Sequence, residues 1–241
     1  MATNKIIGLF GQSNCVGRAD MVDLPLSRQG YLYNLRVWDG NNFEVINHNL
    51  NNNQLGQPSN QFGIEFELRD YANFLNEDIY VCKFGKGGTA LAADPGDDWN
   101  TTTDELHNTI SIYIGRVNTW MNDRGKNFEW VAIIWIQGEK DAQTESYANS
   151  YQANEAALIS AWNSDIGATP YWYICNLHSD SPQDYASTVR SAKSTNAASN
   201  SKYYLIDTDD CSLQDDNIHY DANGYITLGQ KIVNGLKADI T

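Results

Sequence analysis

Cysteine is scarce in this sequence, and no two cysteines stand close together. Cys15, Cys82, Cys175 and Cys211 are spread over 241 residues. This spacing excludes the closely paired cysteines of zinc sites and the dense disulfide framework of small secreted domains. Because a small thiol beside apolar residues is usually buried by packing, we expect four packed cysteines. No cluster of histidine, cysteine and carboxylate residues has metal-ligand spacing, so we expect no metal site.

Basic residues and long apolar runs are also in short supply. Lys and Arg number 16 against 30 Asp and Glu, which gives a net charge of −14. Because phosphate binding draws on clustered Lys and Arg, this balance argues against a nucleic-acid partner. No run reaches the ~18 consecutive apolar residues of a membrane span, and no apolar signal region opens the chain. We expect a soluble protein without a membrane partner, whether cytoplasmic, secreted after loss of a signal peptide or carried on a virion.

Five apolar runs of strand length recur along the chain. They are almost continuous in Ile, Val, Tyr and Trp, which is the pattern of strands buried on both faces. The runs are Lys5–Phe10, Ile79–Phe84, Trp130–Ile136, Tyr171–Asn176 and Tyr203–Asp207. Residues 15–62 form a polar insertion that interrupts the pattern.

Segments with helical periodicity lie between these runs. Apolar residues share one face over 64–75, 106–121 and 147–162, and more weakly over 182–200. Asp221 is the expected N-cap of a last helix with the clearest apolar stripe. Strands that alternate with helices favour a parallel sheet. The sequence therefore predicts one α/β domain over residues 1–241, with a five-stranded parallel sheet and helices on both faces.

Polar motifs follow four of the predicted strands. Gly11-Gln12-Ser13-Asn14 follows the first, Gly85 to Thr89 the second and Gln137 to Asp141 the third, and Asp216 to His219 lies a short loop beyond the fifth. In an open parallel sheet, ligands bind beyond the carboxyl ends of the strands. We expect the four motifs to converge at that edge.

Ser13, His219 and Asp216 are the residue types of a nucleophile, its base and the residue that orients the base. A serine needs a base to take its proton, and neutral imidazole does this near pH 7. A carboxylate three residues before the imidazole can fix its tautomer. Taken alone, Ser13 is more often a turn residue and His219 a surface residue. Their combination predicts acyl transfer by a Ser-His-Asp triad.

An acyl transfer also needs hydrogen-bond donors for the negative oxygen of its tetrahedral intermediate. The candidates are the backbone N–H of Ser13, an N–H of Gly87 or Gly88, and the side-chain amide of Gln137. Glycine lets the backbone approach such an oxygen closely. The plainer interpretation makes the two glycines an ordinary turn.

With these motifs in place, the sequence resembles the SGNH hydrolases, and among them the sialate O-acetylesterases and carbohydrate esterase family 6. The resemblance covers most of the chain. It rests on Gly11-Gln12-Ser13-Asn14, Phe62-Gly63-Ile64-Glu65, Lys83 to Leu91, Gln137-Gly138-Glu139 with Asp141, and Asp216 to His219 with Gly224. Departures from the family pattern are Cys15, Ile64 and Lys140, and none removes a reacting group.

The resemblance implies a flavodoxin-like three-layer α/β/α fold and a serine esterase that needs no cofactor. Its implied substrate is an acetylated carbohydrate, hydrolysed through an acyl-serine intermediate. It supports Ser13, Asp216 and His219 as the triad. It also supports Gly87 and Gln137, with the Ser13 N–H, as oxyanion donors.

Two other classes of function compete with this interpretation. A non-catalytic glycan-binding module, such as an adhesin or phage tail component, could keep the fold for attachment. The complete set of three reacting residues argues against it. In the esterase interpretation, Trp38 and Trp99 are expected in polar loops near the motifs, where they could serve as surfaces for sugars, although core packing explains most aromatic residues equally well. A nucleotide-binding protein of flavodoxin type would need a glycine-rich fingerprint opening a helix after the first strand, which the sequence lacks.

Overall fold

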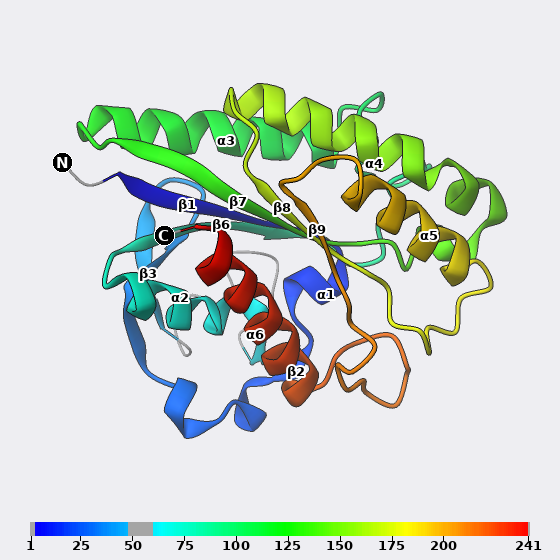
Figure 1. Cartoon of the computed structure of the whole chain (residues 1–241), viewed down its shortest axis with the longest axis horizontal. Helices are drawn as coiled ribbons and strands as arrows, with labels where there is room; N and C mark the ends of the chain where they lie inside the picture. Colours follow the sequence, from blue (N-terminus) through cyan, green and yellow to red (C-terminus); the bar gives the residue numbers. More distant parts are fainter. Residues whose placement is uncertain (1–2, 48–59, 241) are drawn as a thin grey trace.

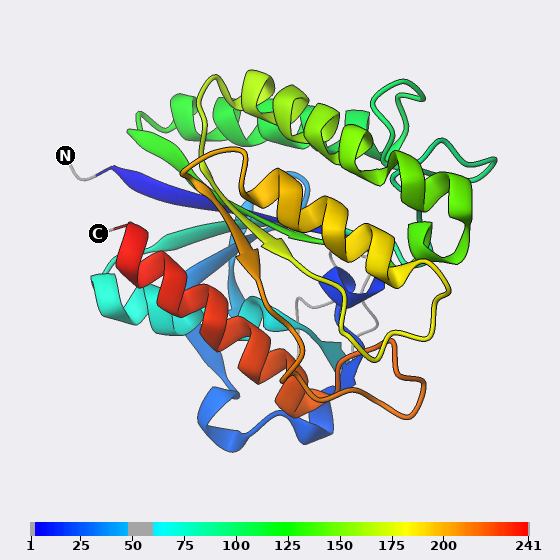
Figure 2. The ribbon, with the colours of Figure 1, turned by 45° about the vertical axis from the view of Figure 1, so that its right-hand side comes forward.

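A twisted seven-stranded sheet forms the centre of the computed structural model (Figures 1 and 2). The structure describes residues 3–47 and 60–240. Its strands run in the spatial order β4-β3-β6-β1-β7-β8-β9. Their bounds are β1 Asn4–Gly11, β3 Tyr31–Trp38, β4 Phe43–Asn47, β6 Ile79–Gly85, β7 Phe128–Ile136, β8 Tyr171–Cys175 and β9 Tyr203–Ile206.

The five predicted strands are all present and mutually parallel, which confirms the α/β class, but the predicted number of strands is wrong. Numbered among themselves, they follow the order 2-1-3-4-5 of flavodoxin-like sheets. Two further strands, β3 and β4, come from the polar insertion. β3 pairs in parallel with β6, and β4 pairs with β3 in antiparallel fashion.

Helices cover both faces of the sheet, as expected. In Figures 1 and 2, α3, α4 and α5 lie over one face, while α2 and α6 lie over the other. The helices are α1 Ser13–Val16, α2 Leu68–Leu75, α3 Leu106–Asp123, α4 Glu145–Ile166, α5 Ala186–Ala197 and α6 Ala222–Asp239. Two-residue strands β2 (Ala19–Asp20) and β5 (Gln61–Phe62) form a separate antiparallel pair. Short 3-10 turns are η1 Met21–Asp23, η2 Leu26–Arg28, η4 Ile64–Phe66 and η5 Asp141–Gln143.

The core consists of two apolar layers, one on each side of the sheet. Successive side chains of a strand point to opposite faces. In β1, Ile7 and Leu9 therefore pack in the layer with α2 and α6, whereas Ile6 and Phe10 pack in the layer with α3, α4 and α5. This division explains why the strand has no polar face.

Local sequence sets the ends of two helices. The Asp221 carboxylate accepts a hydrogen bond from the Gly224 N–H at 2.8 Å, so this residue caps α6 as predicted. The segment that begins at Ile64 starts as a 3-10 turn, and α2 follows only from Leu68. The weak pattern over 182–200 corresponds to α5.

A buried ion pair lies beneath the turn that follows β1. The Lys83 ammonium on β6 is fully buried and lies 2.8 Å from Glu65 Oε2. The same ammonium donates a hydrogen bond to the Val16 carbonyl, also at 2.8 Å. The pair therefore links β6, η4 and the end of α1.

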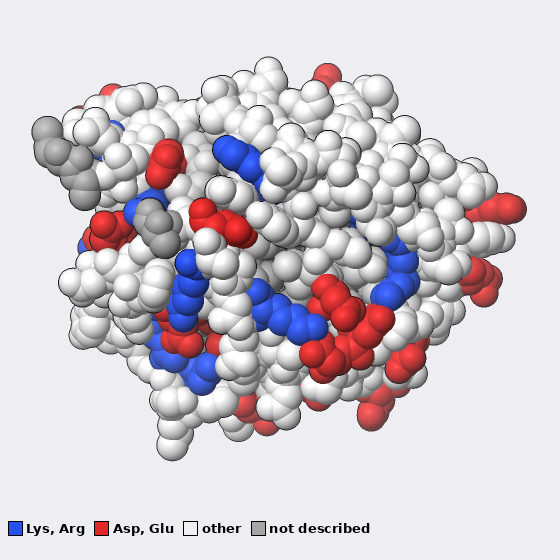
Figure 3. Space-filling model, viewed as in Figure 1, with Lys and Arg blue, Asp and Glu red and all other residues white. Residues whose placement is uncertain are grey.

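Charges of both signs lie close together on the molecular surface. On the face shown in Figure 3, acidic side chains gather beside basic ones. Among the ion pairs, Lys231 pairs with Asp210, and Arg190 pairs with Asp209 at 2.7 Å. Within the described residues, no helix is both long enough and apolar enough to cross a membrane.

Candidate active site

Ser13 stands where β1 ends and α1 begins. The register of the sheet brings the ends of three strands level there, because Gly11 lies opposite both Gly85 and Ile136. Gly11 has a φ of +146°, and a Cβ on it would lie 1.9 Å from the Ile136 carbonyl oxygen. Only glycine fits this close approach. The chain then turns and presents Ser13, which is 5% exposed.

The structure brings Ser13, His219 and Asp216 together. Ser13 Oγ lies 2.9 Å from His219 Nε2, and His219 Nδ1 lies 2.6 Å from Asp216 Oδ2. Burial alone would raise the pKa of Asp216, but hydrogen bonds from the backbone N–H groups of His219 and Ile218 lower it below its ordinary value. The carboxylate is therefore ionised at neutral pH, and it can hold a proton on Nδ1 while Nε2 faces the serine.

All four motifs contribute to one pocket around Ser13 and His219. Its volume is about 330 Å³. The lining residues are Gln12, Ser13, Arg18, Gly87, Gly88, Glu139, Lys140, Gln143, Gln183, Ile218 and His219. The convergence that parallel strands predict at their carboxyl ends is thus present in the structure.

The glycine loop after β6 places Gly87 next to the serine. A Cβ built on Gly87 would lie 3.5 Å from Ser13 Cβ and 2.8 Å from Arg18 Nη2, whereas nothing lies within 4 Å of one built on Gly88. Gly88 has a φ of +72°, so its role is to allow the turn. Of the two glycines left open by the sequence, Gly87 is the one beside the nucleophile.

Gln137 does not point into the pocket, contrary to the sequence-based expectation. Its amide nitrogen donates to the Thr89 carbonyl at 3.1 Å and to Asp141 Oδ2 at 2.6 Å, which uses both of its protons. The side chain is 1% exposed. Gln137 therefore ties β7 to the glycine loop, and it has no donor left for an oxyanion.

Glu139 and Asp141, which follow Gln137 in the third motif, are both buried. Asp141 accepts hydrogen bonds from the backbone N–H groups of Leu91 and Ala92 and so holds the segment after the glycine loop. Glu139 Oε1 accepts a hydrogen bond from Asn14 Nδ2 at 2.6 Å.

Sequence reasoning did not assign a role to several polar side chains at the site, among them Gln12, Asn14 and Arg18. The Gln12 amide oxygen accepts from the N–H groups of Gly138 and Lys140, which joins the first motif to the third. Asn14 joins the first motif to the last, and Arg18 lines the pocket. Gln12 and Asn14 flank Ser13 in its own motif, but spacing alone does not show where an amide will bond.

Other expected contributors lie elsewhere. Trp38 and Trp99 are at most 1% exposed, so neither can serve as a surface for sugars. Trp99 instead donates a hydrogen bond to Thr89 Oγ1 at 2.8 Å, which supports the glycine loop.

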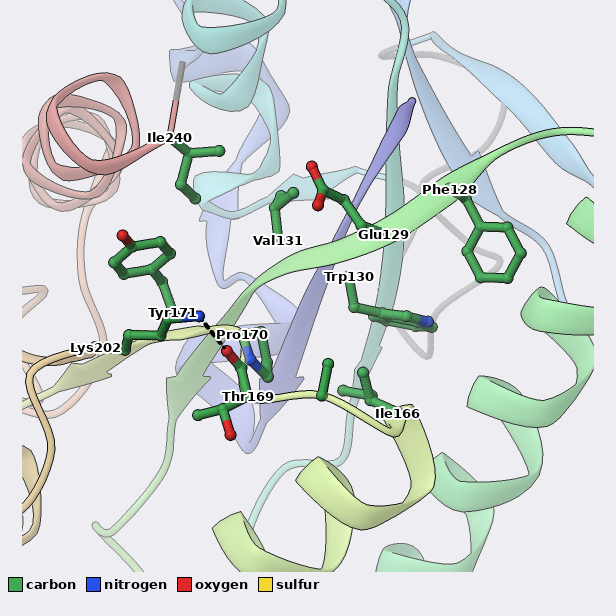
Figure 4. A pocket seen from close by; sticks show the side chains of 11 residues that line it. Phe128, Glu129, Trp130, Val131, Ile166, Thr169, Pro170, Tyr171, Lys202 and Ile240 are labelled. Carbon is green, nitrogen blue, oxygen red and sulfur yellow. Dashed lines mark hydrogen bonds between the residues drawn. The ribbon is translucent and has the colours of Figure 1, made fainter. Parts of the chain in front are cut away.

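A second pocket of about 300 Å³ opens at the opposite edge of the sheet (Figure 4). It lies at the amino ends of β7 and β8, where Lys202 Nζ donates to the Thr169 carbonyl at 2.9 Å. Ser13 and His219 are not part of it. In residues 3–47 and 60–240, no group of three or more His, Cys, Asp or Glu residues is placed to hold a metal ion.

Comparisons with known proteins identify a family. A family model described as carbohydrate esterase, sialic acid-specific acetylesterase, matches residues 3–237. The comparison with curated proteins gives no match.

Several solved structures share the fold at low sequence identity. A protein of Arabidopsis thaliana superposes with a TM-score of 0.81 at 19% identity, and the match covers 100% of both chains. A carbohydrate acetylesterase of Xanthomonas citri gives 0.66 at 15% identity, covering 97% of this chain and 56% of that one. One of Sinorhizobium meliloti gives 0.58 at 14% identity, covering 98% and 99%.

Proposed function

Because the chain belongs to the carbohydrate esterase family of sialic acid-specific acetylesterases, we propose that it removes O-acetyl groups from sugars with Ser13 as the nucleophile. The observation that carries this proposal is the hydrogen-bonded series Ser13–His219–Asp216, with contacts of 2.9 and 2.6 Å. These are the distances over which a proton can pass from a hydroxyl to a positioned base. An acetylated sugar is the substrate class that family membership supports.

In the first step, Ser13 Oγ attacks the carbonyl carbon of the acetyl ester. His219 Nε2 takes the hydroxyl proton as the new C–O bond forms. Asp216 accepts the hydrogen bond from Nδ1 and stabilises the imidazolium. The carbonyl oxygen becomes negatively charged in the tetrahedral intermediate.

Backbone N–H groups would stabilise this oxygen. The N–H group of Ser13 is at the first position of α1, where no preceding turn of helix supplies a carbonyl that could accept its hydrogen bond. That of Gly87 belongs to the residue packed beside Ser13. Such donors are effective because they are already in place when the charge develops.

Collapse of the intermediate breaks the bond to the sugar. The sugar oxygen takes the proton from His219 and leaves as an alcohol, while the acetyl group stays on Ser13. His219 then removes a proton from water, whose oxygen attacks the acetyl carbon. In a second collapse His219 returns the proton to Ser13 Oγ, and acetic acid leaves and ionises to acetate in solvent, so no cofactor is consumed.

The competing proposal is a glycan-binding module that has kept the fold without activity. It does not account for a buried serine at hydrogen-bonding distance from a histidine that is itself paired with a carboxylate. A binding surface needs none of these contacts.

The first test compares wild type with Ser13→Ala in hydrolysis of p-nitrophenyl acetate. We expect kcat to fall by at least about 10³-fold, since removal of a triad nucleophile abolishes the covalent route. Equal rates would exclude the esterase proposal and leave the binding module. Acetate release from acetylated xylan, O-acetylated sialic acids and acetylated bacterial polysaccharides would then identify the sugar.

A further inference from the structure

The loop that carries His219 is rigid within itself. Asp216 Oδ1 accepts hydrogen bonds from the backbone N–H groups of Ile218 and His219, both at 2.9 Å, while Oδ2 faces the imidazole. The Gln214 N–H donates to the His219 carbonyl at 2.8 Å. The acid and the base therefore form one unit without help from Ser13, and a separate contact must set its distance from the serine.

Asn14 supplies such a contact from the position next to the nucleophile, in addition to the hydrogen bond of 3.0 Å from Gln214 Nε2 to the Arg18 carbonyl. Asn14 Nδ2 donates to the Ile218 carbonyl at 2.9 Å, and Asn14 Oδ1 accepts from the Tyr220 N–H at 3.3 Å. These two peptide groups flank His219 on either side. Because Asn14 is 1% exposed, water does not compete for its amide.

The Asn14 amide is fully occupied, and this fixes its orientation. The second proton of Nδ2 goes to Glu139 Oε1 at 2.6 Å, and Oδ1 also accepts from the Tyr225 hydroxyl at 3.1 Å. Two protons and two lone pairs are all that a carboxamide offers. The Glu139 carboxylate only accepts, so it holds the nitrogen on its own side and the oxygen toward the Tyr220 N–H.

We propose that Asn14 is the positioning residue that docks the His219 loop onto the nucleophile turn, with Glu139 as the acceptor that orients its amide. This inference rests on the proposed function, because it concerns how His219 reaches Ser13. Asn14 acts on the distance between Oγ and Nε2 and touches no reacting atom. A misplacement of about 1 Å can cost on the order of 10²-fold in rate.

The test uses Asn14→Ala, Glu139→Met and Glu139→Gln in the full chain. For Asn14→Ala we expect kcat for p-nitrophenyl acetate to fall about 10²-fold with KM nearly unchanged, and labelling of Ser13 by a fluorophosphonate to slow by a similar factor. We expect Glu139→Met to lower kcat and to slow the labelling of Ser13 as well. Glu139→Gln retains an acceptor oxygen for Asn14 and should recover most of the rate lost in Glu139→Met.

The NMR signal of one proton distinguishes a loss of docking between the His219 loop and the nucleophile turn from a disruption of the loop itself. The Nδ1 proton shared by His219 and Asp216 should keep its downfield signal in Asn14→Ala, because that hydrogen bond lies inside the loop. Unchanged kcat in a folded Asn14→Ala, loss of this signal, or a rise in KM with kcat unchanged would overturn the inference. If Asn14→Ala does not fold, an equal loss of kcat in Glu139→Met and Glu139→Gln would also overturn the inference. Activity that survives in Ser13→Ala would instead remove the proposed function.

Discussion

Among single residues, Gly87 controls the space beside the nucleophile. Its substitution by alanine would place a methyl group 3.5 Å from Ser13 Cβ and against the mobile end of Arg18. Because the Arg18 side chain can move, the fold should persist. The methyl group and any shift of the Gly87 N–H would disturb the oxyanion, so we expect kcat to fall by about 10²–10³-fold.

Gly88→Ala is the matched control for this prediction. At a φ of +72° with open space around it, alanine meets backbone strain but no clash. We expect the free energy of unfolding to fall by about 1–2 kcal/mol, with a much smaller effect on kcat than Gly87→Ala. Steady-state kinetics and urea denaturation of both variants check this, and the reverse ranking in kcat would assign the donor to Gly88.

The pH dependence of activity should have an acid limb. The lowered pKa of Asp216 keeps its carboxylate ionised at neutral pH. An imidazolium cannot take the Ser13 proton. Burial also raises the pKa of the Asp141 carboxyl, which holds the segment after the glycine loop, to about 6. We expect log(kcat/KM) for p-nitrophenyl acetate to fall as the pH drops below neutral. A flat profile between about pH 5 and 8 would contradict the proposed base.

The residue types and order of the motifs were enough to predict that His219, Asp216 and the glycine loop come together at Ser13. Their orientations were not predictable, as Gln137 shows. A carboxamide after a buried strand can face the pocket or the protein, and the choice depends on acceptors such as the Thr89 carbonyl and Asp141, which belong to other segments. For the same reason the sequence did not predict the contacts of Asn14, although this residue adjoins Ser13.

At the scale of elements, the Lys83–Glu65 pair holds α1 against β6 and η4. In Lys83→Met the Glu65 carboxylate would stay buried without its cation, and the Val16 carbonyl would lose its donor. We expect the free energy of unfolding to fall by about 3–5 kcal/mol, as measured by urea denaturation.

The double variant Lys83→Met/Glu65→Leu provides the control. With both charges removed, the apolar side chains can fill the space, so most of the lost stability should return. A double variant as unstable as Lys83→Met would mean that the hydrogen bond from Lys83 to the Val16 carbonyl, and not the ion pair, stabilises the fold.

Strands that are apolar along most of their length were predictable from the sequence, whereas β3 and β4 were not. β1, β6, β7 and β8 are nearly continuous in apolar residues because both of their faces are covered. β3 has exposed Tyr31 and Tyr33 and includes Asn34 and Arg36, so its sequence resembles a loop. Its pairing with β6 depends on long-range contacts that no local pattern contains. The predicted insertion 15–62 also includes residues 48–59, which lie outside the described part.

At the scale of the whole molecule, the core encloses all four cysteines as free thiols. Burial raises the pKa of the Cys175 and Cys211 thiols to about 12 and those of Cys15 and Cys82 further still. A pKa near 12 leaves a thiolate fraction of only about 10⁻⁴ at pH 8. We expect 5,5′-dithiobis(2-nitrobenzoate) to modify none of them rapidly in the native protein and all four in guanidinium chloride. Rapid modification of a native thiol would show that part of the core opens readily.

The two apolar layers share one sheet, and the family match extends over residues 3–237. Both observations agree with the prediction of one domain over residues 1–241, which stays a prediction. Cooperative unfolding with a single transition by two different probes would support it.

The distance along the chain between Ser13 and His219 has a consequence for biosynthesis. A ribosome makes the imidazole 206 residues after the alcohol, which at about 5–20 residues per second means a delay on the order of ten to forty seconds. A nascent or prematurely terminated polypeptide that stops before His219 contains a serine with no base. We expect such fragments to be hydrolytically silent, so that the proposed activity begins only after His219 has been made.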